Sequence, residues 1–127
     1  MGPVFLQLSE VLAIHQDQIV RYGGAPGMRE LHLVESAIAV PQAGVGEDYL
    51  HEGLFEMAAA YLYYIVQDHP FIDGNKRTGL ASALVFLKMN GVSVEPDDRL
   101  EALVREVARG KANKTRVVDL LRELAGQ

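Results

Sequence analysis

The stretch HPFIDGNKRTG, residues 69–79, places two adjacent cations where a helix begins. Pro70 and Gly74 break the chain between two segments that are otherwise typical of helices. In the first turn of a helix, the macrodipole disfavours each cation by about 0.3–1 kcal/mol. Lys76 and Arg77 are therefore poorly placed unless a negatively charged group binds beside them.

The composition limits the class of protein. The chain has 127 residues, 49% of them hydrophobic, which suits one domain with its own core, so we expect residues 1–127 to form a single domain. The formal net charge of −5 argues against a nucleic-acid backbone as the main partner, which needs a basic surface.

The sequence also indicates where the protein is found. Cysteine is absent, which excludes disulfides and thiolate zinc sites and is typical of a reducing compartment. The longest apolar run, residues 57–66, is shorter than the roughly 20 residues of a membrane-spanning helix, and the N-terminus lacks the basic start of a signal peptide. We therefore expect a cytoplasmic protein that does not contact membranes.

Apolar residues recur at spacings of three and four along most of the chain, which predicts an all-α fold, a bundle of about six helices. We expect the first helix to begin at Ser9 as N-cap and to end at Gly23-Gly24. The second stops near Pro41, and residues 41–50 (PQAGVGEDYL) form a loop. The first helix carries one apolar stripe, formed by Leu8, Leu12, His15, Ile19 and Tyr22.

Two central helices flank the opening motif. Residues 54–67 and 80–89 are apolar on most of their circumference, which predicts burial on several sides. A further helix opens at Pro96-Asp97-Asp98, and a last one is capped by Thr115.

The motif itself predicts a catalytic base beside a phosphate site. A residue before proline is pushed out of the α region, so His69 lies at the end of a helix with its imidazole presented. A histidine that is mostly neutral at pH 7 can accept a proton from a hydroxyl that attacks phosphorus. Free amides after Gly74, the positive helix end and the cations Lys76 and Arg77 converge on one anion.

Asp73 completes this interpretation. A carboxylate among phosphate-binding cations is most easily explained as a ligand of Mg²⁺, which prefers one or two carboxylates together with substrate phosphates. The implied chemistry is phosphoryl or nucleotidyl transfer to a hydroxyl.

Each of these residues also has an ordinary structural alternative. His69 can cap helix carbonyls, Asp73-Gly74 is a frequent turn pair, and Lys76-Arg77 can be a solvated charge pair. Because all of these residues lie within one short segment, we favour a phosphate-binding site over the structural alternatives. By contrast, His15 lies on an apolar stripe and is expected to be a core histidine rather than a ligand.

These eleven residues resemble the signature of the Fic/Doc superfamily, and Lys76 after Gly74-Asn75 is similar to its Doc (death-on-curing) branch. RYGGAPGM, residues 21–28, also resembles the Doc pattern, and the resemblance extends over the whole chain in length and helix order. It implies a helical toxin of a toxin–antitoxin pair that uses ATP and Mg²⁺. The roles it implies are general base for His69, Mg²⁺ ligand for Asp73, and phosphate binding by Gly74, Asn75, Lys76 and Arg77.

The resemblance also implies a reaction. Fic enzymes that transfer AMP typically have glycine where Lys76 stands, and in Doc-like proteins the nucleotide binds in the reverse sense, with its γ-phosphate near the histidine. This favours a kinase that acts on a Ser/Thr hydroxyl. Two alternatives stay open: an AMP transferase of the same fold, and a non-catalytic module that binds phosphate or DNA, which the acidic net charge disfavours.

The partners follow from the same resemblance. It implies elongation factor Tu as the target, phosphorylated to arrest translation, and a Phd-like antitoxin supplied in trans. The chain has no internal inhibitory helix of the pattern Ser/Thr, three residues, Glu, then Gly or Asn. By position, residues 41–50 would be the flap against which such enzymes hold a target segment as an added strand.

Overall fold

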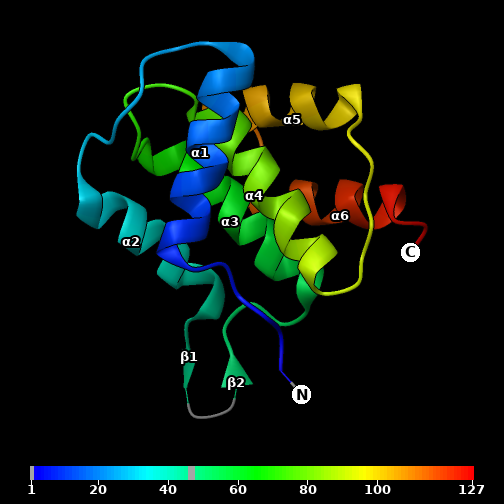
Figure 1. The fold of residues 1–127 in the computed structure, drawn as a ribbon. Helices are drawn as coiled ribbons and strands as arrows, with labels where there is room; N and C mark the ends of the chain where they lie inside the picture. The colour runs from blue at the N-terminus through cyan, green and yellow to red at the C-terminus, as the bar shows by residue number, and fades with distance from the viewer. Residues whose placement is uncertain (1, 46–47) are drawn as a thin grey trace.

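The computed structural model describes residues 2–45 and 48–127, and this part of the chain contains six α-helices and one short hairpin (Figure 1). The prediction of an all-α bundle is confirmed. No helix in the described ranges is long and apolar enough to span a bilayer. The helices are α1 (Leu8–Tyr22), α2 (Leu31–Ala39), α3 (Leu54–Asp68), α4 (Asn75–Met89), α5 (Asp98–Ala108) and α6 (Lys114–Leu124), and a 3₁₀ turn, η1 (Val40–Gln42), follows α2.

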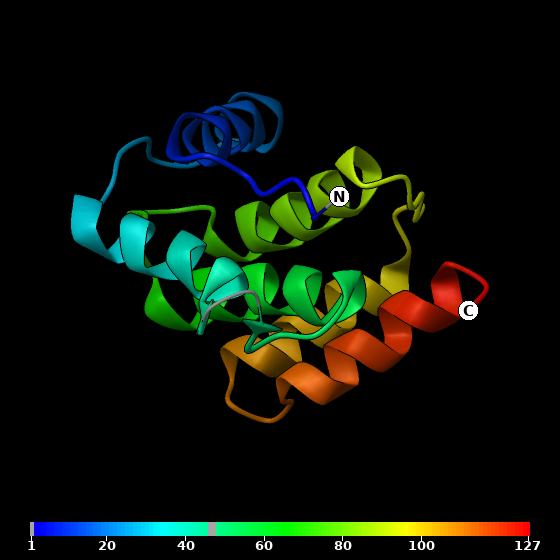
Figure 2. The same ribbon diagram turned by 90° about the horizontal axis from the view of Figure 1, so that it is seen from below.

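The helices are arranged around a central pair. Helices α3 and α4 run side by side and form the middle layer (Figure 2). Helix α1 covers α4 on one side, α5 and α6 cover α3 on the other, and α2 lies beside α3. The segment that joins α3 to α4, residues 69–74, lies at one end of this pair, and it is the motif identified in the sequence.

Helix α3 is buried because neighbours surround it. Nine of its residues are buried, including the run Ala58–Ala60, whose small side chains let other helices approach. Helix α4 packs closely against α3 at Gly79. A Cβ atom at Gly79 would lie 2.9 Å from Cγ2 of Val66 and 3.0 Å from the carbonyl oxygen of Leu62.

Substitution of Gly79 by alanine is therefore expected to destabilise the fold. Overpacking of this kind costs typically about 1–3 kcal/mol, which exceeds the gain of about 1 kcal/mol in helix propensity. Urea unfolding measures the difference. Gly2→Ala is the control, because a Cβ there makes only an ordinary contact, 3.6 Å from Oη of Tyr49. A Gly79→Ala variant as stable as the parent would contradict this account of the α3–α4 contact.

Two predicted N-caps were wrong, while the predicted helix ends at Gly23-Gly24 and near Pro41 are confirmed. Helix α1 begins after Gln7, whose backbone is extended and whose N–H donates to Oε1 of Glu10 at 2.8 Å, so Ser9 lies inside the helix. Helix α6 is capped by Asn113, whose Oδ1 accepts from the Arg116 amide at 3.1 Å. Asparagine is at least as strong a cap as threonine, and here it takes the place predicted for Thr115.

The segment predicted as a loop, residues 41–50, contains a small hairpin. Strand β1 (Gly44–Val45) pairs antiparallel with β2 (Asp48–Tyr49), and the Leu50 amide donates to the Ala43 carbonyl at 2.9 Å. Residues 46 and 47 of the predicted flap lie outside the described residues. Strands of two residues are too short to produce a recognisable alternation in the sequence.

The position of the hairpin corrects the flap prediction. The hairpin precedes α3, whereas His69 follows it, so the two lie at opposite ends of this helix (Figure 1). A helix of 15 residues is about 22 Å long. Tyr49 packs against Phe5 with ring centroids 5.5 Å apart, and Phe5 stacks on Phe86 in the last turn of α4, so a target strand added to the hairpin would not lie beside His69.

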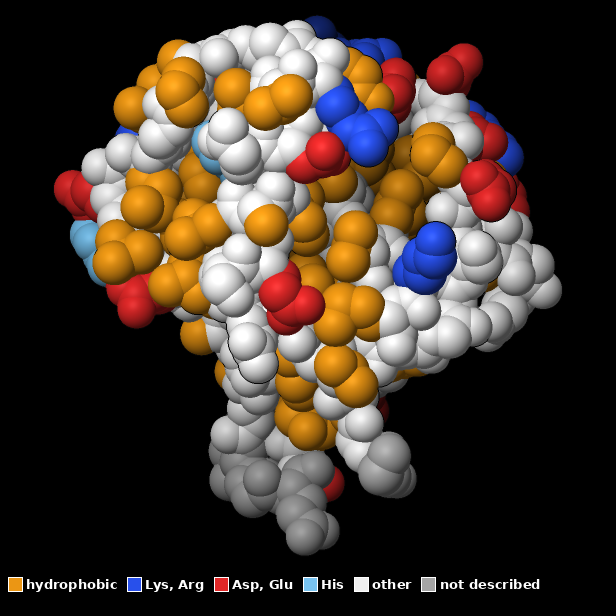
Figure 3. All heavy atoms as spheres, in the orientation of Figure 1, with side chains coloured by type: hydrophobic (Ala, Val, Ile, Leu, Met, Phe, Trp, Pro, Cys, Tyr) orange, Lys and Arg blue, Asp and Glu red, His pale blue; other side chains and the backbone are white. Residues whose placement is uncertain are grey.

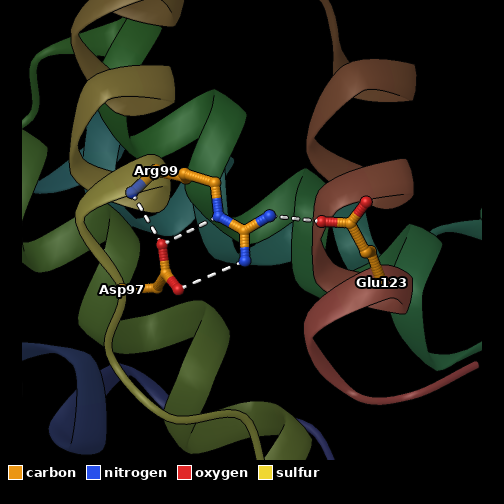
Figure 4. A network of polar contacts seen from close by, with 3 residues as sticks. All are labelled: Asp97, Arg99 and Glu123. Carbon is orange, nitrogen blue, oxygen red and sulfur yellow. Dashed lines mark hydrogen bonds and ion pairs between the residues drawn. The ribbon is translucent and has the colours of Figure 1, made fainter.

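The C-terminal helices are connected by polar contacts. Arg99 donates through its backbone N–H to Oδ1 of Asp97 at 2.8 Å and forms ion pairs with Asp97 and Glu123 (Figure 4). The hydrogen bonds from Arg99 lower the pKa of the Asp97 carboxyl group. Arg99 and Glu123 are largely exposed and Asp97 is half-buried, so the ion pairs orient α5 and α6 more than they stabilise them.

A second polar cluster connects the end of the hairpin to α6. Nζ of Lys114 donates to Oη of Tyr64 at 2.9 Å and lies 3.1 Å from Nε2 of His51. Partial burial and the nearby Lys114 ammonium both lower the pKa of His51. In the unfolded chain His51 takes up a proton as the pH falls through about 6.5, whereas in the folded protein it stays neutral to lower pH.

Folding stability is therefore expected to decrease as the pH falls from 7.5 towards 5.5, and His51→Gln should reduce that loss. Glutamine keeps a polar side chain but does not titrate. Urea unfolding at both pH values measures the effect, with His32→Gln as control because His32 is largely exposed. Equal pH dependence in the parent and the His51→Gln variant would contradict the assignment.

Candidate functional site

The site is built on the loop between α3 and α4, and it begins with an unusual backbone. His69 follows the last residue of α3 in the left-handed conformation, with φ 48° and ψ 55°. It is the only residue other than glycine with a positive φ among the described residues. This conformation costs a non-glycine residue roughly 1–2 kcal/mol. The side chain of His69 is exposed, and its imidazole makes no hydrogen bond to another described residue, so it is available to a substrate.

The middle of the loop is anchored in the core. Phe71 is 1% exposed, and its ring is stacked on that of His15 with centroids 3.8 Å apart. The Asn75 side chain closes the loop: its Oδ1 accepts from the Phe71 amide and its Nδ2 donates to the Phe71 carbonyl, both at 2.9 Å. Because the side-chain amide of Asn75 is turned to the Phe71 backbone and the residue is only 8% exposed, we expect a contact from Asn75 to a phosphate to come from its backbone N–H.

Asp73 is exposed and ionised. Its Oδ1 accepts from the Gly74 amide at 2.8 Å, and its Oδ2 accepts from the Ala25 amide at 3.2 Å. These two hydrogen bonds, followed by the charges of Arg77 and Lys76, lower the pKa of Asp73. Each carboxylate oxygen retains a lone pair for another ligand.

The side chains of the site can hold Mg²⁺ only if a substrate supplies further ligands. The described residues contain no group of three or more His, Asp or Glu side chains placed to hold a metal ion. Mg²⁺ is commonly bound by one or two carboxylates, with phosphates and water completing its coordination. Asp73 alone, beside a phosphate site, matches that pattern.

Helix α4 starts directly after Asp73 and Gly74. Gly74 adopts the left-handed conformation, with φ 78°, and the first amides of α4 point away from the helix without intrahelical partners. Nη2 of Arg77 donates to the Gly23 carbonyl at 2.9 Å, and its guanidinium lies 5.6 Å from the ring centroid of Tyr22. Lys76 is exposed, and its ammonium has no hydrogen-bond or ion-pair partner in the part of the chain described here.

His15 has the role expected of it. It is 4% exposed, and Nε2 lies 2.8 Å from the carbonyl oxygen of Asp73. A carbonyl only accepts, so Nε2 carries the proton. His15 therefore donates a hydrogen bond to the backbone of Asp73 and is a core histidine.

A second segment, residues 23–29, lies along the loop and was assigned no role from its sequence. The Ile72 amide donates to the Gly27 carbonyl at 3.1 Å, and Met28 pairs with Phe71 in an isolated antiparallel bridge. The Arg29 amide donates to the Pro70 carbonyl at 2.8 Å. The sequence signals for this segment were the resemblance of residues 21–28 to the Doc pattern and the glycines at 23, 24 and 27, which all have positive φ in the structure.

Arg29 is a residue that sequence reasoning missed altogether. Its Nη1 donates to the carbonyl oxygen of His69 at 2.7 Å, across 40 residues of sequence. A contact of this range leaves no periodic or local pattern in a single sequence.

Comparison with known proteins identifies the family of the chain. The model of the Fic/DOC family matches residues 5–87. The chain is 42% identical over 117 residues to the protein kinase doc of Escherichia phage P1, with 92% of each chain covered. It is 40% identical over 92 residues to toxin Doc of Mycolicibacterium smegmatis, covering 70% of this chain and 71% of that protein. This chain belongs to the Fic/DOC family.

Proposed function

We propose that this protein is the toxin of a toxin–antitoxin pair and transfers the γ-phosphate of ATP to a Ser/Thr hydroxyl of a protein. One observation carries the proposal. An exposed imidazole, His69, and an exposed ionised carboxylate, Asp73, lie on one loop that leads directly into the N-terminus of α4 with its two cations. The relatives named as a Doc kinase and a Doc toxin support it.

In the proposed reaction His69 is the general base. The hydroxyl oxygen of the target forms a bond to the γ-phosphorus, the bond from that phosphorus to the bridging oxygen breaks, and ADP leaves with that electron pair. His69 takes the hydroxyl proton, a contribution of about 10²–10⁴ in rate. Asp73 would hold Mg²⁺, which would neutralise part of the negative charge of the phosphates.

The start of α4 is proposed to hold the phosphate chain. Its free N–H groups and positive dipole end favour an anion. Lys76 is free to bind a phosphate directly, while Arg77 reaches the same region with one guanidinium nitrogen already bonded to the Gly23 carbonyl. When the nucleotide is bound, the attraction of these cations to its phosphates outweighs their unfavourable interaction with the helix dipole.

Kinase chemistry is favoured over AMP transfer by the residue at position 76. AMP-transferring Fic enzymes typically have glycine there, and Lys76 would occupy the space in which they hold the outer phosphates. AMP transfer is the second candidate, because the same base and phosphate site would serve either reaction.

The target and the inhibitor are part of the proposal. Elongation factor Tu is the proposed target, so that its phosphorylation arrests translation, and a Phd-like antitoxin is the proposed inhibitor. Hydrophobic side chains are spread over the face formed by α1 and α4 (Figure 3), and Val20, Val85 and Met89 on these helices are exposed. Scattered exposed apolar side chains are normal on a protein surface, so the proposal of these partners rests on the family resemblance.

The test is a parallel incubation of the protein and purified elongation factor Tu with α-labelled and γ-labelled ATP in the presence of Mg²⁺. The proposal predicts γ-label on the factor and none from the α-labelled nucleotide. Label from the α-position would establish AMP transfer instead. Absence of label from both, with a cell lysate as well as with the purified factor, would contradict a transferase.

A further inference from the structure

Arg29 binds three consecutive carbonyl groups at the end of α3. Its Nη1 donates to the carbonyl of His69 at 2.7 Å and lies 3.5 Å from that of Asp68. Its backbone N–H donates to the carbonyl of Pro70 at 2.8 Å. A single residue from the segment before α2 thus contacts the backbone on both sides of His69.

These carbonyls need a donor from outside the helix. The last carbonyls of a helix have no intrahelical partner. A helix that ends in a left-handed residue is usually closed by the N–H of the next residue, which bonds back to the last turn. Here the next residue is Pro70, which has no N–H. Among the described residues no backbone N–H from residue 69 or 70 bonds back to α3, and the Arg29 guanidinium instead donates to the carbonyls of Asp68 and His69 at this helix end.

The positive charge of Arg29 is also favourable at the C-terminal end of α3. The C-terminal end of a helix carries partial negative charge, which a guanidinium complements. Arg29 is also fixed at its own backbone, because Gly27 and Arg29 flank the Met28–Phe71 bridge and bond to Ile72 and Pro70. The guanidinium is therefore delivered from a segment that is itself bonded to the loop.

We propose that Arg29 is a positioning residue for the reaction: it stabilises the left-handed conformation of His69 and so sets the direction of the imidazole. This inference rests on the proposed role of His69 as the base. Without Arg29 the carbonyls of residues 68 and 69 lose their donor, and the backbone of His69 is free to adopt other conformations. Among the described residues Arg29 makes no hydrogen bond to residues 74–77, so we expect the phosphate site at the start of α4 to be retained.

The test compares Arg29→Met, which keeps the length of the side chain without donors, with Arg29→Lys, which keeps the charge and a donor. Arg29→Met is expected to lower kcat by about 10- to 100-fold, as small misplacements of a catalytic group do. The KM for ATP should stay within about twofold, because ground-state binding is retained. Arg29→Lys should recover part of kcat. The control is Arg21→Met, which removes an exposed arginine paired with Asp17.

A second measurement does not depend on activity. Backbone chemical shifts of His69 report its left-handed conformation, and we expect them to move towards random-coil values in Arg29→Met while those of the α3–α4 core stay in place. If Arg29→Met is unfolded at the assay temperature, Arg29→Lys and Arg29→Gln are compared at a lower temperature with the same readouts.

The outcomes separate this inference from the proposed function. If His69→Ala is inactive but Arg29→Met keeps the parent kcat, positioning by Arg29 is refuted and the base is retained. A loss of activity that only follows the unfolded fraction, with His69 shifts unchanged, would assign Arg29 a purely structural role and also refute the inference. An active His69→Ala variant would instead overturn the proposed function.

Discussion

Replacement of His69 by alanine is expected to abolish phosphate transfer and leave the fold intact. The rate should fall by at least the factor of about 10²–10⁴ that a general base contributes. The imidazole is exposed and bonded to no other described residue, so its removal costs the folded state little. Transfer of γ-label to elongation factor Tu measures the rate, and urea unfolding measures stability.

Two further variants make this result specific. His69→Asn keeps a polar side chain that tolerates the left-handed conformation but is not a base at neutral pH, so it should be as inactive as alanine. His32→Ala, which removes another exposed histidine, should transfer at the parent rate. Full activity of either His69 variant would contradict the assignment of the base.

Substitution of Lys76 is expected to have opposite effects on stability and on activity. Without nucleotide, Lys76→Met should be more stable than the parent by about 0.3–1 kcal/mol, because it removes a cation from the positive end of α4. With nucleotide, loss of a hydrogen bond to a charged group costs about 1.5–3 kcal/mol, which corresponds to a decrease of about 10- to 100-fold in kcat/KM. Urea unfolding without ATP and steady-state kinetics with ATP measure the two effects.

Comparison of Lys76→Gly with Lys76→Met separates the effect of the lysine charge from the effect of the volume that its side chain fills. Both substitutions remove the charge, but only glycine opens the volume that the lysine side chain fills, so only Lys76→Gly should admit transfer of α-label. Lys88→Met, at the other end of α4, is the control: it should leave kcat/KM unchanged and, because a cation in the last turn of a helix is favourable, lower stability by about 0.3–1 kcal/mol, the opposite of Lys76→Met. An unchanged kcat/KM in Lys76→Met, or identical products from both Lys76 variants, would refute the role given to this residue.

Much of the fold was predictable because its signals are local and repeated. Apolar residues at helical spacing indicated the central helices, and a glycine pair ended α1 as expected. The caps were less certain. Ser9 and Thr115 are good capping residue types, yet the caps are Gln7 and Asn113, since several polar residues lie within two positions of each helix start and only the backbone geometry selects one.

The site was predictable as a segment but not in its internal contacts. The motif located His69 and Asp73 on one loop and the cations Lys76 and Arg77 at the start of the next helix, and the structure places them there. The pattern could not show that the Asn75 side chain is occupied by the Phe71 backbone, or that Arg29 bonds to His69 from 40 residues away. Both facts depend on how distant segments pack. The flap prediction was wrong for the same reason, because the position of the hairpin follows from the length and direction of α3.

The central claim is that the N-terminus of α4 and the loop before it bind the phosphates of a nucleotide. Titration of the protein with ATP and Mg²⁺, followed through backbone amide resonances, tests it most directly. The account predicts that the largest and saturable shifts occur at the free first-turn amides of Asn75, Lys76 and Arg77, and that they weaken in Lys76→Met. Saturable shifts elsewhere with none at these three amides, or no shifts at millimolar ATP, would contradict it.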